Sequence, residues 1–258
     1  MPEKPRILVS NDDGIQAEGL AALVGALEEL AEIWVVAPDS EQSTASHGIT
    51  IRRPLRLKEV EGKTHWFSVD GQPSDCAWMG INHVLRDKRP QLLVSGINHG
   101  PNLADDVIYS GTVAVAREAS MLGVPSIAFS LASRHNFDFG PGARFARALV
   151  ESALGELPPS KHLSVNFPEG EIDGWVASVQ GKHSYGTEVV EKTDPRGRKY
   201  YWIGGNEYKH EDIPGSDCNA VFRTGRAAIT ALTLDFTDDA LRKRVRGWSL
   251  KGYERHEA

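Results

Sequence analysis

The chain has 258 residues, of which 40% are hydrophobic and 25% are charged, a composition typical of a folded domain rather than a disordered chain. Its net charge is −6, so the basic surface expected of a protein that binds a nucleic acid polymer is absent at the level of the whole chain. Two cysteines, Cys76 and Cys218, are too few for a disulfide framework. The apolar run near the N-terminus is too short for a signal peptide or a membrane span. We therefore expect a cytoplasmic protein with neither a membrane nor a nucleic acid polymer as partner.

The first forty residues have the pattern of a strand, a helix and a second strand. Ile7 to Val9 form a β-branched run that ends at the turn sequence Asn-Asp-Asp-Gly. Apolar residues then recur at helical spacing from Glu18 to Ala31, and a second strand over 32–37 stops at Pro38. Such a unit implies a right-handed crossover and therefore a parallel sheet.

Alternating strands and helices continue to about Pro168. After residue 48 we expect strands at 49–58 and 64–69 as a hairpin around Gly62, a helix from Pro73 to Leu85, a strand at 91–94, a helix at 111–122, a strand at 124–130, a helix at 143–154 and a strand at 162–166. Cys76 lies among apolar neighbours in one of these helices, and we expect it in the core.

Beyond Pro168 the pattern changes. Strand-like runs at 174–179, 200–203 and 227–234 alternate with turn residues, and no helix is expected before the C-terminal one. That last helix begins near Asp238, with acidic residues first and basic residues towards its end, as the helix dipole favours. The sequence thus predicts one α/β domain with a β-rich C-terminal elaboration that ends in a helix.

Polar loops follow three predicted strands of this sheet. They contain Asn11-Asp12-Asp13-Gly14, the run from Asp39 to Ser43, and Asn98 with Asn102 beyond it. Loops at the carboxyl ends of parallel strands share one edge of the sheet, where ligands bind. Adjacent carboxylates repel in a low-dielectric site, and oxygen-only ligands suit a hard cation such as Mg²⁺ or Mn²⁺. The same Asn-Asp-Asp-Gly run also fits a plain turn that caps a helix.

A second candidate site is the segment Ser110-Gly111-Thr112, directly before the helix expected from Val113. Ser110 is a natural N-cap, Gly111 permits close approach of a ligand to the backbone, and a free helix N-terminus favours a phosphate. Taken alone, these residues are better explained by simple capping of the helix. Next to a hard cation, however, a phosphate-binding helix start indicates phosphate chemistry.

Several long motifs resemble the survival protein SurE family. They are Ser10 to Gly14, Val36-Ala37-Pro38-Asp39, Val94 to Leu103 continuing through Asp105 to Ala114, Gly123-Val124-Pro125, Val165 to Pro168, and Asp194 to Gly197 with Tyr201 to Gly204. The resemblance covers most of the chain. It implies a three-layer Rossmann-like fold with a mainly parallel sheet and helices on both faces. It also divides the single domain 1–258 into a catalytic core at 1–168 and a β-rich extension at 169–258 that acts as an oligomerisation arm.

The resemblance further implies a cytoplasmic, metal-dependent phosphatase of nucleoside 5′-monophosphates, often also of 3′-monophosphates, that forms homodimers or homotetramers. Asp12, Asp13, Ser43 and Asn98 match the positions of the family's ligands for one divalent cation per subunit, and Asp12 and Asp13 are the candidate catalytic residues. Ser110, Gly111 and Thr112 match its phosphate-binding loop, and we assign Asn11 and Asn102 to the substrate. Glu41 is a departure, because basic residues often precede the ligand serine in relatives. It brings an acidic group close to an anionic substrate and could alter substrate preference.

Two other classes of function fit parts of the sequence. The β-α-β start with Asp39 at the end of its second strand resembles a dinucleotide-dependent oxidoreductase, but the first loop lacks the glycine pattern that binds a pyrophosphate. A nucleotide sensor without catalysis would use the same pocket residues. Measured phosphate release separates both classes from a phosphatase.

Overall fold

The structure is a computed structural model that describes residues 4–133, 135, 137–204 and 208–254. Its core is one mixed sheet with the strand order β3-β4-β2-β1-β5-β6-β7-β13-β8 among the described residues. These strands are β1 (Arg6–Ser10), β2 (Glu32–Pro38), β3 (Leu57–Glu59), β4 (Trp66–Val69), β5 (Leu92–His99), β6 (Ser126–Ala132), β7 (His162–Pro168), β8 (Trp175–Ser178) and β13 (Ala227–Leu232). Only the β3–β4 and β7–β13 pairs are antiparallel in this sheet.

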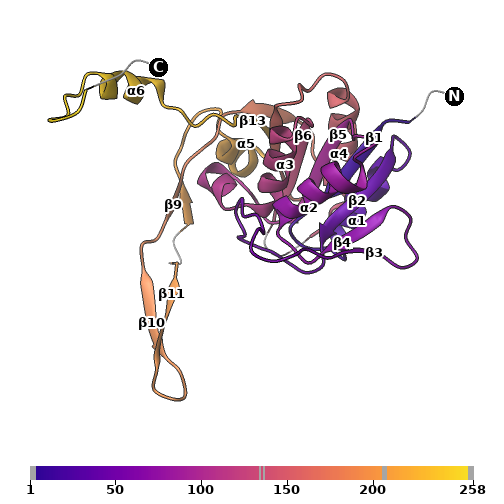
Figure 1. Ribbon diagram of the computed structural model, residues 1–258, viewed down its shortest axis with the longest axis horizontal. Helices are drawn as coiled ribbons and strands as arrows, with labels where there is room; N and C mark the ends of the chain where they lie inside the picture. The colour runs from indigo at the N-terminus through magenta and orange to yellow at the C-terminus, as the bar shows by residue number, and fades with distance from the viewer. Residues whose placement is uncertain (1–3, 134, 136, 205–207, 255–258) are drawn as a thin grey trace.

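Helices cover both faces of the sheet, as Figure 1 shows. One face packs against α1 (Glu18–Leu27) and α4 (Gly140–Ala153), and the other against α2 (Pro73–Met79), α3 (Gly111–Met121) and α5 (Asp217–Thr224). Successive side chains of a strand point to opposite faces, so Ile7 and Val9 join the first core while Leu8 joins the second. Both layers are apolar and buried, which confirms the predicted three-layer α/β fold.

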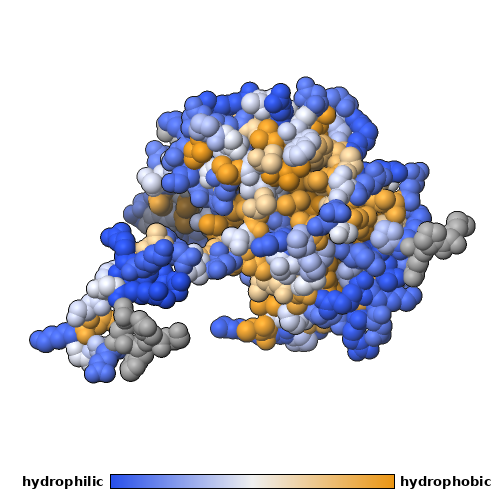
Figure 2. All heavy atoms as spheres, turned by 90° about the horizontal axis from the view of Figure 1, so that it is seen from above, coloured by the Kyte–Doolittle hydropathy of each residue, from blue (hydrophilic) through white to orange (hydrophobic). Residues whose placement is uncertain are grey.

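Three further elements project from this body. The strands β10 (Val189–Thr193) and β11 (Lys199–Ile203) form an antiparallel ribbon, which starts near the shorter pair β9 (His183–Tyr185) and β12 (Tyr208–His210). Figure 1 shows the ribbon pointing away from the sheet and α6 (Asp239–Arg246) lying apart from it on another side. Figure 2 shows from above one part of the chain projecting from the body, and hydrophobic side chains gathered over the middle of the face in view.

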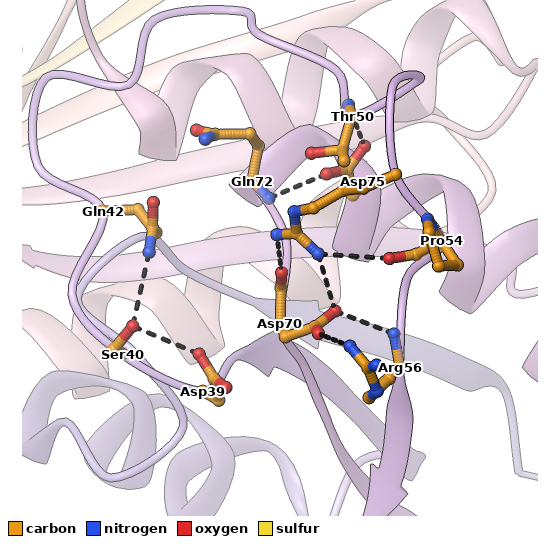
Figure 3. A network of polar contacts seen from close by, with 10 residues as sticks. Asp39, Ser40, Gln42, Thr50, Pro54, Arg56, Asp70, Gln72 and Asp75 are labelled. Atoms are coloured by element: carbon orange, nitrogen blue, oxygen red, sulfur yellow. Dashed lines mark hydrogen bonds and ion pairs between the residues drawn. The ribbon is translucent and has the colours of Figure 1, made fainter.

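The segment 49–56 differs from its predicted strand. Only Leu57–Glu59 pairs with β4, although the predicted hairpin around Gly62 is present. The backbone N–H of Thr50 donates to Asp75 and that of Arg56 donates to Asp70, at 2.8 Å each. Figure 3 shows these two carboxylates facing the loop. Carboxylates thus take the donors that a strand ladder would otherwise use.

Other boundaries differ for local reasons. The helix predicted to reach Ala31 ends at Leu27, and the helix predicted to reach Leu85 changes at Met79 into the short π-helical turn η1 (Gly80–Val84). β5 continues through the expected glycine-rich loop to His99, with a register irregularity between Ser95 and Asn98. Asn98 therefore lies on a strand end rather than in a loop.

The C-terminal third also contains a helix that the periodicity did not predict. α5 covers only two turns, begins at the N-cap Ser216 and ends at Gly225, which has a left-handed backbone conformation. β8 and β13 continue the central sheet beyond Pro168, so this part of the chain adds to the body as well as to the projections. The last predicted helix is confirmed as α6, with Asp238 as its N-cap. Among the described residues, no helix is long and apolar enough to cross a membrane.

Candidate active site

The predicted loops meet at the carboxyl edge of the sheet. β1 lies between its parallel neighbours β2 and β5, so the residues that follow these strands are close together. They enclose a cavity of about 250 Å³. Its lining residues are Asp12, Ser43, Thr44, Asn98, His99, Pro101, Asn102, Asp106, Tyr109, Ser110 and Tyr185. Segments that are far apart in the sequence thus form one polar pocket.

Asp12 is a buried carboxylate at this cavity, with 5% of its surface exposed. Burial, and then the neighbouring charge of Asp13, raise the pKa of Asp12 to about 7. The hydroxyl of Thr112 donates a hydrogen bond to Asp12 Oδ1. A cation next to the carboxylates would remove both causes of the raised pKa, because it replaces lost solvation and offsets the repulsion.

Asp13 lies beside the cavity rather than in its lining. Its Oδ2 is 3.0 Å from His99 Nδ1 and accepts a hydrogen bond of 3.3 Å from the His99 backbone N–H. His99 itself lines the cavity. The structure therefore ties Asp13 to the end of β5, and its role as a metal ligand remains a prediction.

Ser43 and Asn98 both present neutral oxygens to the cavity. The Asn98 amide nitrogen donates to the Gly100 carbonyl at 2.8 Å, which leaves its Oδ1 available to a cation. The Ser43 hydroxyl donates to Glu41 at 2.6 Å, so its lone pairs remain available. No group of three or more His, Cys, Asp or Glu side chains in the described part of the chain could hold a metal. The oxygen set of Asp12, Ser43 and Asn98 nevertheless fits a hard cation.

The loop that carries Ser43 is fastened at several points. Its Gln42 backbone N–H donates to the Asp12 carbonyl at 2.8 Å, and the Ser46 hydroxyl donates to the Ile108 carbonyl at 2.8 Å. Four residues after Ser43, His47 Nε2 lies 2.7 Å from the buried carboxylate of Glu118 on α3. The loop thus has a defined position over the sheet edge although its surface is partly exposed.

The start of α3 meets Asp12 directly. Ser110 is the N-cap and accepts a hydrogen bond from Val113 N at 3.1 Å, while its side chain lines the cavity. A Cβ on Gly111 would lie 2.7 Å from Asp12 Cβ, so only glycine fits at that position. Thr112 is fully buried and orients Asp12. This arrangement places the open N-terminus of a helix next to the candidate cation ligands.

The two predicted substrate residues have different positions. Asn102 lines the cavity, and its amide donates to Ser130 Oγ at 2.8 Å. Asn11 is fully buried, is not part of the lining, and donates to the Gly14 carbonyl at 2.9 Å. The Asn11 side chain thus closes the turn that carries Asp12 and Asp13, and substrate contact by either asparagine remains a prediction.

Sequence reasoning missed Asp106, Tyr109 and Tyr185 as cavity residues. Asp106 and Tyr109 belong to the 3₁₀ turn η2 (Ala104–Ile108) and its end, inside the long motif that leads to Ser110. They lie in the sequence between two predicted parts of the site, Asn102 and Ser110, and this position could have indicated that they line the cavity. Tyr185 comes from β9, far along the chain, and no local pattern in the sequence places it here.

Comparisons with known proteins identify the family. A family model described as "Survival protein SurE" matches residues 7–187. The chain is similar to "5'-nucleotidase SurE" of Myxococcus xanthus (strain DK1622), with 62% identity over 260 residues that cover 100% of this chain and 98% of that protein. The protein of the same name from Anaeromyxobacter dehalogenans (strain 2CP-C) is 54% identical over 255 residues, covering 98% and 99% of the two chains.

A solved structure agrees with these matches. The crystal structure of the SurE protein from Aquifex aeolicus superposes with a TM-score of 0.82 at 37% identity, covering 94% of this chain and 98% of that one. The chain therefore belongs to the survival protein SurE family.

Proposed function

We propose that this chain is a metal-dependent 5′-nucleotidase that hydrolyses nucleoside 5′-monophosphates, and also 3′-monophosphates, to nucleoside and phosphate. The observation that carries this proposal is the buried Asp12 carboxylate, which shares one cavity with Ser43, Asn98 and the N-terminus of α3. Relatives named 5'-nucleotidase SurE match essentially the whole chain and support the same activity.

Asp12, Asp13, Ser43 and Asn98 would hold one divalent cation per subunit, Mg²⁺ or Mn²⁺. The donor set consists of oxygens, with no thiolate or imidazole among the four, which favours a hard ion. A cation held there would supply charge neutralisation at the phosphate oxygens and a Lewis-acid site for the attacking water of an in-line displacement. Thr112 holds Asp12 in place through its hydroxyl, and His99 holds Asp13.

Ser110, Gly111 and Thr112 provide the phosphate end of the site. The first backbone N–H groups of α3 and the positive end of its dipole favour a phosphoryl group with developing negative charge. Asn102, whose backbone N–H is fixed on Asn166 at 2.7 Å, and Asn11 are the polar side chains that we assign to the substrate.

We further propose that the protein is a homodimer or homotetramer in the cytoplasm. The ribbon β10–β11 and helix α6 carry large exposed apolar side chains, including Trp202 at 63% and Ile203 at 92% exposure. Exposed apolar surface on projecting elements is typical of an interface. Residues 169–258 act as the oligomerisation arm in this proposal, and the core 1–168 carries the chemistry.

Phosphate release from a panel of nucleoside monophosphates tests this function. We expect release with Mg²⁺ or Mn²⁺, none after complete chelation, and recovery when the metal is returned. Activity that survives full chelation, or activity that persists in Asp13→Asn, would remove the metal role. Tight retention of nucleotide without phosphate release would instead make the protein a sensor.

A further inference from the structure

We propose that Tyr185 forms the platform on which the nucleobase of the substrate lies, so that the projecting arm contributes to substrate choice. This inference rests on the proposed function and names the part of the site that selects for a nucleotide over other phosphate esters. The observation behind it is that Tyr185, on β9 at the base of the arm, lines the same cavity as Asp12 and Ser110. About half of its surface, 49%, is exposed.

The Tyr185 ring is held in place by the site itself. Its hydroxyl donates to Asp106 Oδ1, and Asp106 Oδ2 lies 3.1 Å from Nδ1 of His183. The His183 side chain is fully buried and meets the Tyr185 ring edge to face, with the ring centres 5.8 Å apart. The hydroxyl is therefore engaged away from a ligand, which leaves the ring as the group that Tyr185 offers to the cavity.

The start of the arm is fastened to the wall of the cavity through η2. The His183 backbone N–H donates to Asp105 at 3.1 Å, and His183 Nε2 lies 3.3 Å from Cys218 Sγ. Asp217 joins the same segments, because its carboxylate accepts from Ala104 N and from Gly181 N at 2.9 Å each. These contacts fix the strand β9 relative to η2, so the ring loses little freedom when a ligand stacks on it.

The size of the cavity places the base at the position of Tyr185. A volume of about 250 Å³ is below the range of pockets that enclose a drug-sized ligand. Asp12 is buried beside the N-terminus of α3, where the proposed cation and the phosphate would bind, so the base of a nucleotide would extend towards the half-exposed Tyr185. Every nucleobase has a flat π face that can stack on an aromatic ring, and this stacking depends little on which base it is.

Comparison of a nucleotide with the same sugar phosphate lacking its base tests this inference. For Tyr185→Ala we expect kcat/KM for AMP to fall about tenfold, mainly through KM, within the range of base–aromatic stacking. Hydrolysis of ribose 5-phosphate should change less than about twofold. Tyr185→Phe keeps the ring and loses the bond to Asp106, so it should keep most of the preference for AMP.

Tyr109 is the alternative residue on which the base could stack, since it lines the same cavity and is 60% exposed. A loss specific to AMP in Tyr109→Ala, with none in Tyr185→Ala, would overturn the proposal. An equal loss for AMP and ribose 5-phosphate in Tyr185→Ala would also overturn it. As controls, thermal unfolding shows that each variant is folded, and the metal concentration needed for activity shows that it still binds metal. Failure of the proposed function has a different signature: the wild-type protein itself would release phosphate from ribose 5-phosphate but from no nucleotide. Failure of the Tyr185 inference alone would leave the wild type active on nucleotides.

Discussion

The body and the projections of this molecule differ in the burial of their side chains: the body buries apolar and charged groups, and the projections leave theirs exposed. In the body, Asp12, Glu118 and Asp217 are buried, and each has a named partner. In the ribbon β10–β11 all side chains are exposed, and helix α6 has no buried residue. The body is therefore organised around its own interior, while the projections present their apolar side chains outward.

This contrast agrees with the proposal that the body carries the chemistry and the projections carry the assembly. A two-stranded ribbon is at best marginally stable alone in water, so its shape depends on what it contacts. The body has a core on both faces of the sheet and does not need the ribbon for stability. Changes in the body, and at Tyr185 where the arm meets the cavity, should thus affect chemistry or folding, whereas changes in the ribbon β10–β11 and in α6 should affect association.

The largest effect is expected from Asp12→Asn. Loss of this carboxylate weakens the hold on the cation and on the charge that develops in the transition state, so phosphate release should fall about 1000-fold, or ~4 kcal/mol. Metal should stabilise the wild type by ~2.7 kcal/mol at a hundred times its dissociation constant, and stabilise the variant much less. Thermal unfolding with and without Mg²⁺ checks the second effect. Full activity in Asp12→Asn would contradict the assignment of this cavity as the active site.

His162 provides a prediction for stability against pH. It is buried on β7, and burial, followed by the charges of Arg117, His47 and Lys161, lowers its pKa to about 4 from 6.5. Between these values the unfolded chain binds a proton that the folded chain does not, so stability falls as pH drops from about 6.5 to about 4. The loss approaches ~3 kcal/mol over this window at 1.36 kcal/mol per pKa unit.

Urea unfolding at pH 7 and pH 4.5 measures this loss. In His162→Gln the side chain does not titrate, and the polar group opposite Ser120 is kept, so the difference in stability between the two pH values should shrink by about 2 kcal/mol. An equal pH dependence in wild type and variant would show that other groups control acid stability.

A smaller effect is expected at His47. Its contact with Glu118 fastens the loop that carries Ser43, so His47→Ala should raise the metal concentration needed for half-maximal activity about tenfold. The rate at saturating metal should change little, because His47 lies outside the cavity lining. His47→Gln, which retains a donor for Glu118, is the matched control. An unchanged metal requirement in the alanine variant would argue against a positioning role.

Much of this arrangement was predictable because local patterns set it. The β-branched run before Asp12 and the apolar period of α1 predicted the first strand and helix, and the parallel unit they imply brings Asp12, Ser43 and Asn98 to one edge. The strand expected at 49–58 forms only from Leu57, because Asp70 and Asp75, outside that segment, accept from N–H groups of its first part. α5 was too short for a clear period.

Tyr185 shows the limit of such reasoning more clearly. Its place at the cavity depends on bonds from Asp105, Asp106 and Asp217 to residues at the base of the arm. Each of these bonds joins two residues that are more than thirty positions apart in the sequence, and only the folded chain brings them together. Periodicity and spacing report short-range order, so they carry no information on contacts of this kind.

The smallest effect on the body is expected from the double substitution Trp202→Ser and Ile203→Ser on β11. Both side chains are exposed, and surface changes of this kind usually alter the stability of a chain by less than about 0.5 kcal/mol. The same changes should remove apolar anchors from an interface, which often cost more than 1 kcal/mol each. Sedimentation should therefore show a lower mass for the variant than for the wild type. Lys199→Ser, on the same strand and also exposed, should leave the mass unchanged. If the double variant kept its mass and instead unfolded more easily at every protein concentration, the ribbon would belong to the folding unit of the body, and the contrast between body and projections would be wrong.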